Sequence, residues 1–199
     1  MKIEGRKPGP REARPRKPGA APDASRLREA ALAHLARFAA TEAGLARVLT
    51  RRVERWAHAV DDAEAAAPQR DAALAAIPGI IDELRGLGAL NDAAFAESRS
   101  RRLARAGKSR RATLVHLAAK GIDAGLAATA TESQADQDLA SACAYLRRRR
   151  LPPFGAGDPL RAMAALARNG FDRETAERAL ALDAAGAEAL VIALRRGDR

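Results

Sequence analysis

The sequence predicts an all-α protein, a curved array of three imperfect three-helix repeats with a disordered basic N-terminal arm. Composition is the first observation. Of the 199 residues, 47% are hydrophobic and only 3% are aromatic, and most of the hydrophobic residues are alanine and leucine. These two residue types lose little freedom in a helix. The second observation is a glycine–apolar–aspartate pattern that occurs twice along the chain. The third is helical spacing of apolar residues between such breaks.

The arm comprises residues 1–22, which hold five of the ten prolines and almost no apolar side chains. Such a segment buries too little surface to offset the entropy of ordering it, so we expect it to be disordered. It contains seven basic and two acidic residues, which is half of the net charge of +10. The remaining chain is therefore only moderately basic, and a partner must be bound by a local patch.

The first repeat is expected over residues 23–88. Asp23 or Ser25 is a suitable cap for its first helix, and Thr41 for its second. A looser stretch over residues 61–78 contains two prolines, and the helix that follows it ends near Gly88. Apolar positions expected along the first two helices are Leu27, Leu32, Leu35, Phe38, Leu45, Val48, Leu49, Val53 and Trp56.

The second repeat is expected over residues 89–134, and the third over residues 135–199, including a C-terminal tail. Residues 120–123 (KGID) and 169–172 (NGFD) share one pattern at an offset of 49 residues. A left-handed glycine ends one helix, an apolar residue packs back, and an aspartate caps the next helix. The same offset matches Asp158 to Ser109 as helix caps. The first repeat is a weaker copy, because Val53 stands where the glycine would be.

Two groups of segments resemble the RecX family of regulatory proteins. Residues 88–96 (GALNDAAFA), 107–111 (GKSRR) and 120–122 (KGI) are similar to its central repeat. Residues 145–154 (YLRRRRLPPF) and 167–171 (ARNGF) are similar to its last repeat. The resemblance extends over residues 25–183, and departs from the family at Arg99 and Ser100, where an aromatic and a β-branched residue are more usual.

The resemblance implies a protein that binds the RecA recombinase filament and inhibits its recombinase, ATPase and coprotease activities. Single- or double-stranded DNA is a further expected partner, and the protein is expected to be a monomer. The alternative is an independent helical nucleic-acid-binding protein that grips phosphates with its basic residues. Salt dependence separates the two, because direct duplex binding weakens steeply as salt rises.

The candidate partner- or DNA-binding residues are all basic. They are Arg99, Arg102, Lys108, Arg110, Arg111, Lys120, Arg147, Arg148, Arg149, Arg150, Arg161 and Arg168. The run of four arginines at residues 147–150 is either a solvated helix end, favoured by the helix dipole, or a clamp for phosphate or carboxylate. The cations at residues 108–111 lie at a helix start, where the helix dipole disfavours positive charge. Their presence there favours a role in binding a partner.

Helical geometry places three of these residues. Arg161 and Arg168 are seven residues apart and share one face, opposite a predicted core face made by Leu160, Met163, Leu166 and Ala167. Arg99 falls between Phe95, Leu103 and Ala106. Its stem then lies on apolar surface with its head in water, which is the favoured interpretation. In the alternative, Arg99 faces a groove between repeats.

No enzyme chemistry is indicated, and no catalytic, cofactor or metal-binding residues are predicted. The three histidines show no metal-ligand pairing, and no phosphate-binding Gly-x-x-x-x-Gly-Lys loop is present. Cys143 is the only cysteine, lies on an apolar face and fits a core thiol in a reducing cytoplasm. No apolar run is long enough for a membrane span. Scarce aromatic residues argue against sequence-specific reading of single strands.

Overall fold

The computed structural model describes residues 19–197, and this part of the chain forms ten α-helices and no strand. The predicted all-α class is confirmed, whereas residues 1–18 of the predicted arm lie outside the described residues. The helices are α1 (Ala24–Leu35), α2 (Glu42–Ala57), α3 (Ala63–Gly86), α4 (Asp92–Arg105), α5 (Arg110–Lys120), α6 (Ala124–Ala130), α7 (Glu132–Arg149), α8 (Pro159–Arg168), α9 (Arg173–Ala181) and α10 (Ala184–Arg196).

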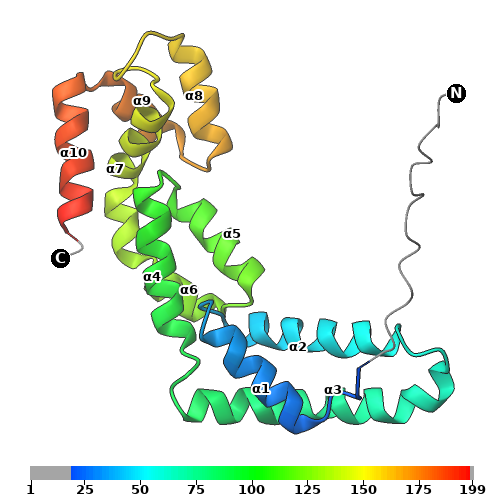
Figure 1. Cartoon of the computed structure of the whole chain (residues 1–199). Helices are drawn as coiled ribbons and strands as arrows, with labels where there is room; N and C mark the ends of the chain where they lie inside the picture. The colour runs from blue at the N-terminus through cyan, green and yellow to red at the C-terminus, as the bar shows by residue number, and fades with distance from the viewer. Residues whose placement is uncertain (1–18, 198–199) are drawn as a thin grey trace, which may run out of the picture.

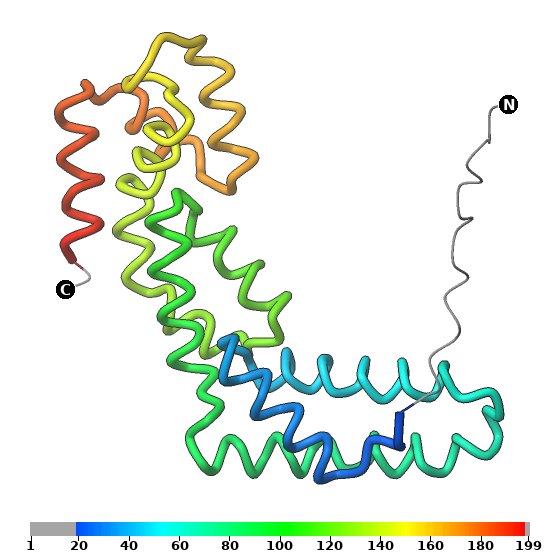
Figure 2. Tube along the Cα trace, in the orientation of Figure 1, coloured from blue at the N-terminus to red at the C-terminus, as the bar shows by residue number. Residues whose placement is uncertain are grey.

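The helices form a bent array in which three helix groups follow one another (Figure 1). The first group, α1–α3, makes one limb, and the second group, α4–α6, lies at the bend. The third group, α7–α9, makes the other limb together with α10, and α8–α10 surround the end of α7. The course of the chain in Figure 2 shows that α2, α5 and α8 lie on the inner side of the bend. Each is the second helix of its group, so the inner side is built from equivalent helices.

The predicted break between the second and third helices of a repeat is confirmed at both places. Gly121 and Gly170 adopt left-handed φ values of 84° and 87°. The residues after them, Ile122 and Phe171, are both 5% exposed and pack into the interior. Aspartate side chains then cap α6 and α9, as the sequence pattern requires.

The start of each inner helix meets the end of the next one. The Thr41 hydroxyl at the start of α2 donates a hydrogen bond of 2.7 Å to the Lys120 carbonyl at the end of α5. The Ser109 hydroxyl at the start of α5 donates one of 2.9 Å to the Asn169 carbonyl at the end of α8. Lys120 and Asn169 are 49 residues apart in sequence, so the two joints are equivalent.

A second contact repeats at the same joints. The first backbone N–H of α2, at Glu42, donates to the Asp92 carboxylate at 2.9 Å. The first backbone N–H of α5, at Arg110, donates to the Asp138 carboxylate, also at 2.9 Å. Each aspartate belongs to the first helix of the following repeat, and helix N-termini favour such anions. Paired contacts therefore fix how each repeat is oriented on the next.

These joints explain why the first repeat has no terminal glycine. Gly121 and Gly170 lie against the starts of α2 and α5, where a Cβ atom would meet Ala43 or Ser109. In the described part of the chain no repeat precedes α2, so its end has no such neighbour. Helix α2 accordingly continues through Val53, which is fully buried, to Ala57.

A buried polar network compensates for Ser100. The Ser100 hydroxyl donates to the Gln134 side chain at 3.2 Å, and both residues are buried. Gln134 in turn donates to the Lys108 carbonyl at 2.9 Å and to the Thr113 hydroxyl at 3.1 Å. Helices α4, α5 and α7 are thus joined by satisfied buried polar groups in addition to apolar contacts.

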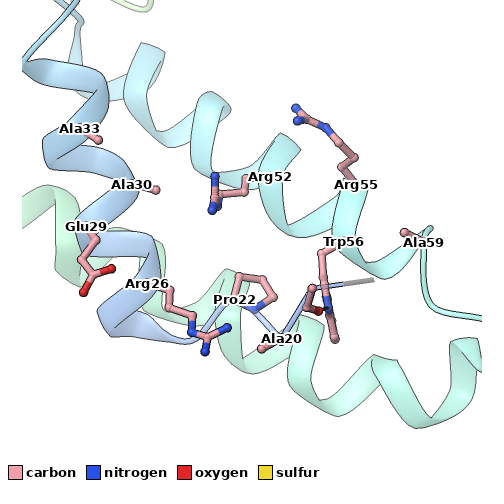
Figure 3. A pocket seen from close by; sticks show the side chains of 11 residues that line it. Ala20, Pro22, Arg26, Glu29, Ala30, Ala33, Arg52, Arg55, Trp56 and Ala59 are labelled. Atoms are coloured by element: carbon pink, nitrogen blue, oxygen red, sulfur yellow. Dashed lines mark hydrogen bonds between the residues drawn. The ribbon is translucent and has the colours of Figure 1, made fainter. Parts of the chain in front are cut away.

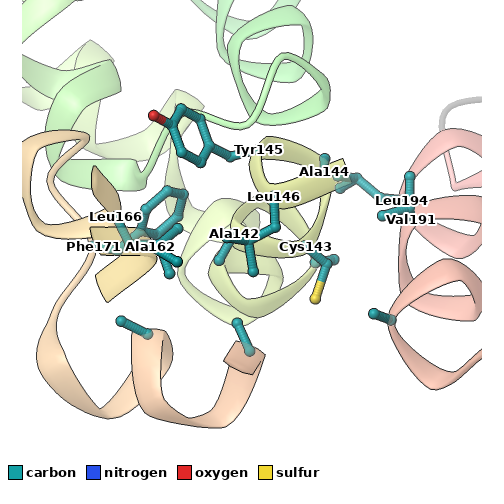
Figure 4. Close-up of a cluster of buried hydrophobic side chains, with 14 of the residues drawn as sticks. Ala142, Cys143, Ala144, Tyr145, Leu146, Ala162, Leu166, Phe171, Val191 and Leu194 are labelled. Atoms are coloured by element: carbon teal, nitrogen blue, oxygen red, sulfur yellow. The ribbon is translucent and has the colours of Figure 1, made fainter. Parts of the chain in front are cut away.

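The largest core surrounds α7, and Figure 4 shows part of it. Leu146 packs with Leu166 of α8, Phe171 and Val191 of α10 in one buried cluster. Residues 184–196, which the sequence analysis leaves within the C-terminal tail, therefore form a packed helix. Cys143 belongs to the same cluster, and burial raises its pKa to about 11, which confirms an inert core thiol.

The looser stretch predicted over residues 61–78 is wrong, because α3 is one continuous helix that contains Pro68 and Pro78. Its N-terminal part is rich in alanine, and Ile77, Ile80 and Ile81 are buried against α1 and α2. The apolar face of α3 therefore outweighs the backbone hydrogen bonds that two prolines remove.

Residues 19–22, which the sequence analysis places in the arm, contact the first repeat. Pro22 is buried, and the Trp56 indole N–H donates to the Gly19 carbonyl at 3.0 Å. Figure 3 shows Trp56 and Pro22 beside a cavity of about 650 Å³ between α1 and α2. Trp56 is half-buried and anchors the end of the arm, instead of lying deep in the core.

Candidate partner-binding surface

The helices of the inner side of the bend have the largest excess of basic over acidic residues. Helices α2, α5 and α8 contain nine basic and two acidic residues. Helices α3, α6 and α9, the third helices of their groups, contain four basic and six acidic residues. The inner side therefore favours an anionic partner, whereas the third helices do not.

Helix α8 presents the predicted pair of arginines to solvent. The Arg161 side chain is 88% exposed and lies 3.8 Å from Asp158, the capping residue of its own helix. Arg168 is exposed at the last position of the helix. Their predicted exposure is confirmed, and exposed ion pairs such as Arg161–Asp158 contribute little stability.

The core face predicted for α8 is partly wrong. Leu160 is 79% exposed, and Ala167 is exposed as well, while Ala162, Ala165 and Leu166 are buried. Leu160 lies in the first turn of α8, which extends beyond the helices that cover the rest of it. An apolar side chain therefore stands beside Arg161 on the exposed surface.

Helices α5 and α2 extend this surface. On α5, Arg111 is exposed, and Val115, one turn further on, is 67% exposed. On α2, Arg51 and Arg55 are exposed, and sequence reasoning missed both. Their spacing of four residues, on the side of the helix away from Leu45 and Leu49, is the signal that identifies them.

Three of the predicted cations have structural roles instead. Lys108 donates to the Asn169 side chain at 3.0 Å across the joint between α5 and α8. The Arg110 side chain donates to the Thr131 carbonyl at 3.0 Å. Arg147 forms an ion pair of 2.6 Å with Glu188 of α10. All three side chains are half-buried, so they are less accessible to a partner than the exposed arginines are.

The rest of the arginine run at the end of α7 is exposed. The guanidinium carbons of Arg148 and Arg149 each lie 5.9 Å from the centre of the Tyr145 ring. Arg150 ends the helix in a left-handed conformation with φ of 53°. The run thus divides, with Arg147 turned inward and the other three available to solvent.

Arg99, Arg102 and Lys120 come together in a groove between the first two repeats. The groove has a volume of about 630 Å³, and Arg37 of the α1–α2 connection is a fourth cation in its lining. The Arg99 side chain donates to the His116 ring at 2.8 Å and is only partly exposed. Arg99 therefore faces the groove between the repeats, the position given by the alternative interpretation.

The face predicted for α4 is displaced by one residue. Ala96, Ser100 and Ala104 are its buried residues, whereas Phe95 and Leu103 are only half-buried. Arg99 is placed by that displacement at the edge of the core rather than on its surface.

Among residues 19–197, no three histidine, cysteine, aspartate or glutamate side chains are arranged to hold a metal ion. In the same part of the chain, no helix combines the length and apolar character that crossing a membrane requires.

The fold and this surface define a class, that of helical-repeat proteins with a basic inner side. A family model described as the second three-helix domain of RecX matches residues 91–130. The regulatory protein RecX of Myxococcus xanthus is 34% identical over 164 residues, which is 77% of this chain and 83% of that protein. The chain therefore belongs to the RecX family of regulatory proteins.

Two further similarities agree with this assignment. The regulatory protein RecX of Mycobacterium ulcerans is 39% identical over 107 residues, covering 49% of this chain and 60% of that protein. The crystal structure of RecX from Lactobacillus salivarius shares the fold, with a TM-score of 0.55 and 22% identity. That match covers 80% of this chain and 95% of the other.

Proposed function

We propose that this chain binds the RecA nucleoprotein filament and inhibits its recombinase, ATPase and coprotease activities. Membership of a family of regulatory proteins supports a regulatory role. The observation that carries the proposal is the concentration of nine basic residues against two acidic ones on α2, α5 and α8. A filament that contains DNA is a polyanion of the kind that such a surface attracts.

The mechanism is occupation of the filament surface. Exposed arginines such as Arg111, Arg161 and Arg168 supply forked donors for phosphates or carboxylates. Leu160 and Val115, which are exposed on α8 and α5, add apolar contacts that salt does not screen. A bound array of this length would block the approach of other DNA and of protein substrates. We expect the protein to act as a monomer in the cytoplasm, where its partner is found.

An independent nucleic-acid-binding protein remains the second candidate. Its support is the net charge of +10, half of it in residues 1–22. Binding to phosphates alone weakens steeply with salt, while recognition of a protein surface retains a salt-insensitive part. Measuring the affinity for RecA filaments and for bare DNA over a range of salt concentrations separates the two.

Charge reversal on α8 tests the proposed surface. The double substitution Arg161→Glu and Arg168→Glu is expected to weaken inhibition of the RecA ATPase at least about tenfold, because two lost charge-assisted contacts cost about 1.5–3 kcal/mol each. Exposed changes of this kind alter stability by less than about 0.5 kcal/mol. The measurement is a dose–inhibition curve for each protein, with circular dichroism to verify the fold.

The matched control is Arg195→Glu with Arg196→Glu at the exposed end of α10. It changes the net charge by the same amount but lies in a helix on the other side of α7 from α8 (Figure 1). We expect its inhibition curve to match that of the unaltered protein. Equal curves for all three proteins would exclude α8 and direct attention to residues 148–150.

A further inference from the structure

The groove between the first and second repeats is lined by four cations. Helix α4 contributes Arg99 and Arg102, the end of α5 contributes Lys120, and the α1–α2 connection contributes Arg37. Among residues 19–197, no acidic residue lines this groove, which we call the Arg99 groove. Its other lining residues are Leu35, Phe38, Ala39, Ala40, Ala89, Asn91, Ala94, Phe95 and Ser98.

Arg99 is held there without a carboxylate. Its Nε donates to His116 Nε2, so that nitrogen of the imidazole carries no proton. Burial and the nearby Arg102 lower the pKa of Arg99, and burial together with Arg99, Lys120 and Arg102 lowers the pKa of His116. All of the charged groups that affect this pair are cations.

Two of the three other half-buried arginines in the described part of the chain are paired with carboxylates. Arg70 lies 2.6 Å from Glu54, and Arg147 lies 2.6 Å from Glu188. A recessed charge is costly unless an opposite charge or hydrogen bonds compensate it. Arg99 therefore pays a desolvation cost that an arriving anion would offset.

The walls of the groove indicate the kind of anion. They combine the cations with apolar side chains, among them Phe95 and Phe38, which is 54% exposed. The Phe38 ring is already in contact with Arg37, whose guanidinium carbon lies 5.5 Å from the ring centre, and with the His34 ring at 5.3 Å. These contacts hold the Phe38 ring, and its exposed part suits contact with an aliphatic or aromatic side chain.

We infer that the Arg99 groove binds a short acidic segment of a protein partner, in which carboxylates flank an apolar side chain. The carboxylates would reach Arg99, Arg102 and Lys120, and the apolar side chain would lie against Phe38 and Phe95. Carboxylate and guanidinium form paired hydrogen bonds, which favour this geometry. The inference can be tested separately from the proposed RecA function, because the binding test contains no filament.

The test uses a short fluorescein-labelled peptide of alternating glutamate and leucine, with binding followed by fluorescence anisotropy. Arg99→Gln with Arg102→Gln removes two groove charges but retains an amide that can donate to His116. We expect this variant to bind the peptide about tenfold more weakly or worse. Arg195→Gln with Arg196→Gln loses the same charge on α10, and we expect its affinity to remain within about twofold of the original.

The His116 ring supplies a second readout, since the chain has only three histidines. Saturation with the peptide should raise the pKa of His116, measured by NMR, because a carboxylate offsets the surrounding cations. Equal weakening of both variants, or an unchanged His116 pKa, would overturn the inference. Tighter binding of a labelled oligothymidylate through Arg99 and Arg102 would likewise overturn it, in favour of a nucleic-acid site.

Discussion

Replacing Leu166 with alanine is expected to lower the free energy of unfolding by about 2–5 kcal/mol, the range for leucine truncation in a core. Leu166 is fully buried in the cluster around α7, together with Leu146 and Phe171. Its carbonyl also accepts the Phe171 N–H that closes the end of α8. Truncation therefore leaves a cavity where α8 and α9 meet α7. The measurement is urea or thermal unfolding of the purified protein followed by circular dichroism.

Leu160→Ala is the matched control, because it removes the same atoms from the same helix. Leu160 is 79% exposed, so the change should be within about 0.5 kcal/mol of neutral. A cost for Leu160→Ala near that of Leu166→Ala would show that Leu160 is in the core. In that case the orientation of α8 described above would be incorrect, and so would the exposed position of Arg161.

Replacing Gly170 with alanine is expected to cost about 2–4 kcal/mol, from left-handed strain together with overpacking. Gly170 has a φ of 87°, and a Cβ atom there would lie 2.6 Å from the Ser109 hydroxyl oxygen. That hydroxyl donates to the Asn169 carbonyl and accepts from the Ala112 N–H at the joint between α5 and α8. The substitution therefore opens the joint between the second and third repeats as well as straining the backbone.

Gly88→Ala separates these two causes. Gly88 has a φ of 71°, but nothing lies within 4 Å of the position that its Cβ would occupy. Only the conformational cost applies, so we expect about 1–2 kcal/mol. Comparing thermal unfolding of the two variants measures the joint directly, and equal losses of stability would contradict its close packing.

Local structure was predictable where one residue determines it. Asp23, Thr41 and Ser109 each accept a backbone N–H at a helix start, as expected from their side chains alone. Gly121 and Gly170 were recognisable because few other residues adopt a positive φ. The repeat offset of 49 residues then followed from these signals without any knowledge of packing.

Features that depend on distant partners were not predictable. Arg147 reads as part of a basic run, yet Glu188, 41 residues later, neutralises it. Leu160 fits the apolar period of α8, but no other described element covers the first turn of that helix. The extent of α3 depends on burial of its isoleucines against α1 and α2, which local proline rules do not include. The groove around Arg99 is likewise assembled from three segments of two repeats.

The central claim is that the chain recognises the RecA filament through the basic inner side of its bend. Co-sedimentation with RecA filaments and with bare DNA, at increasing salt, tests it most directly. We expect binding to filaments to persist at salt concentrations that release the chain from bare DNA. We also expect filament binding to be lost in the Arg161→Glu and Arg168→Glu variant but not in the Arg195→Glu and Arg196→Glu control. Filament binding that follows bare-DNA binding at every salt concentration, and that is equal in both variants, would contradict the claim.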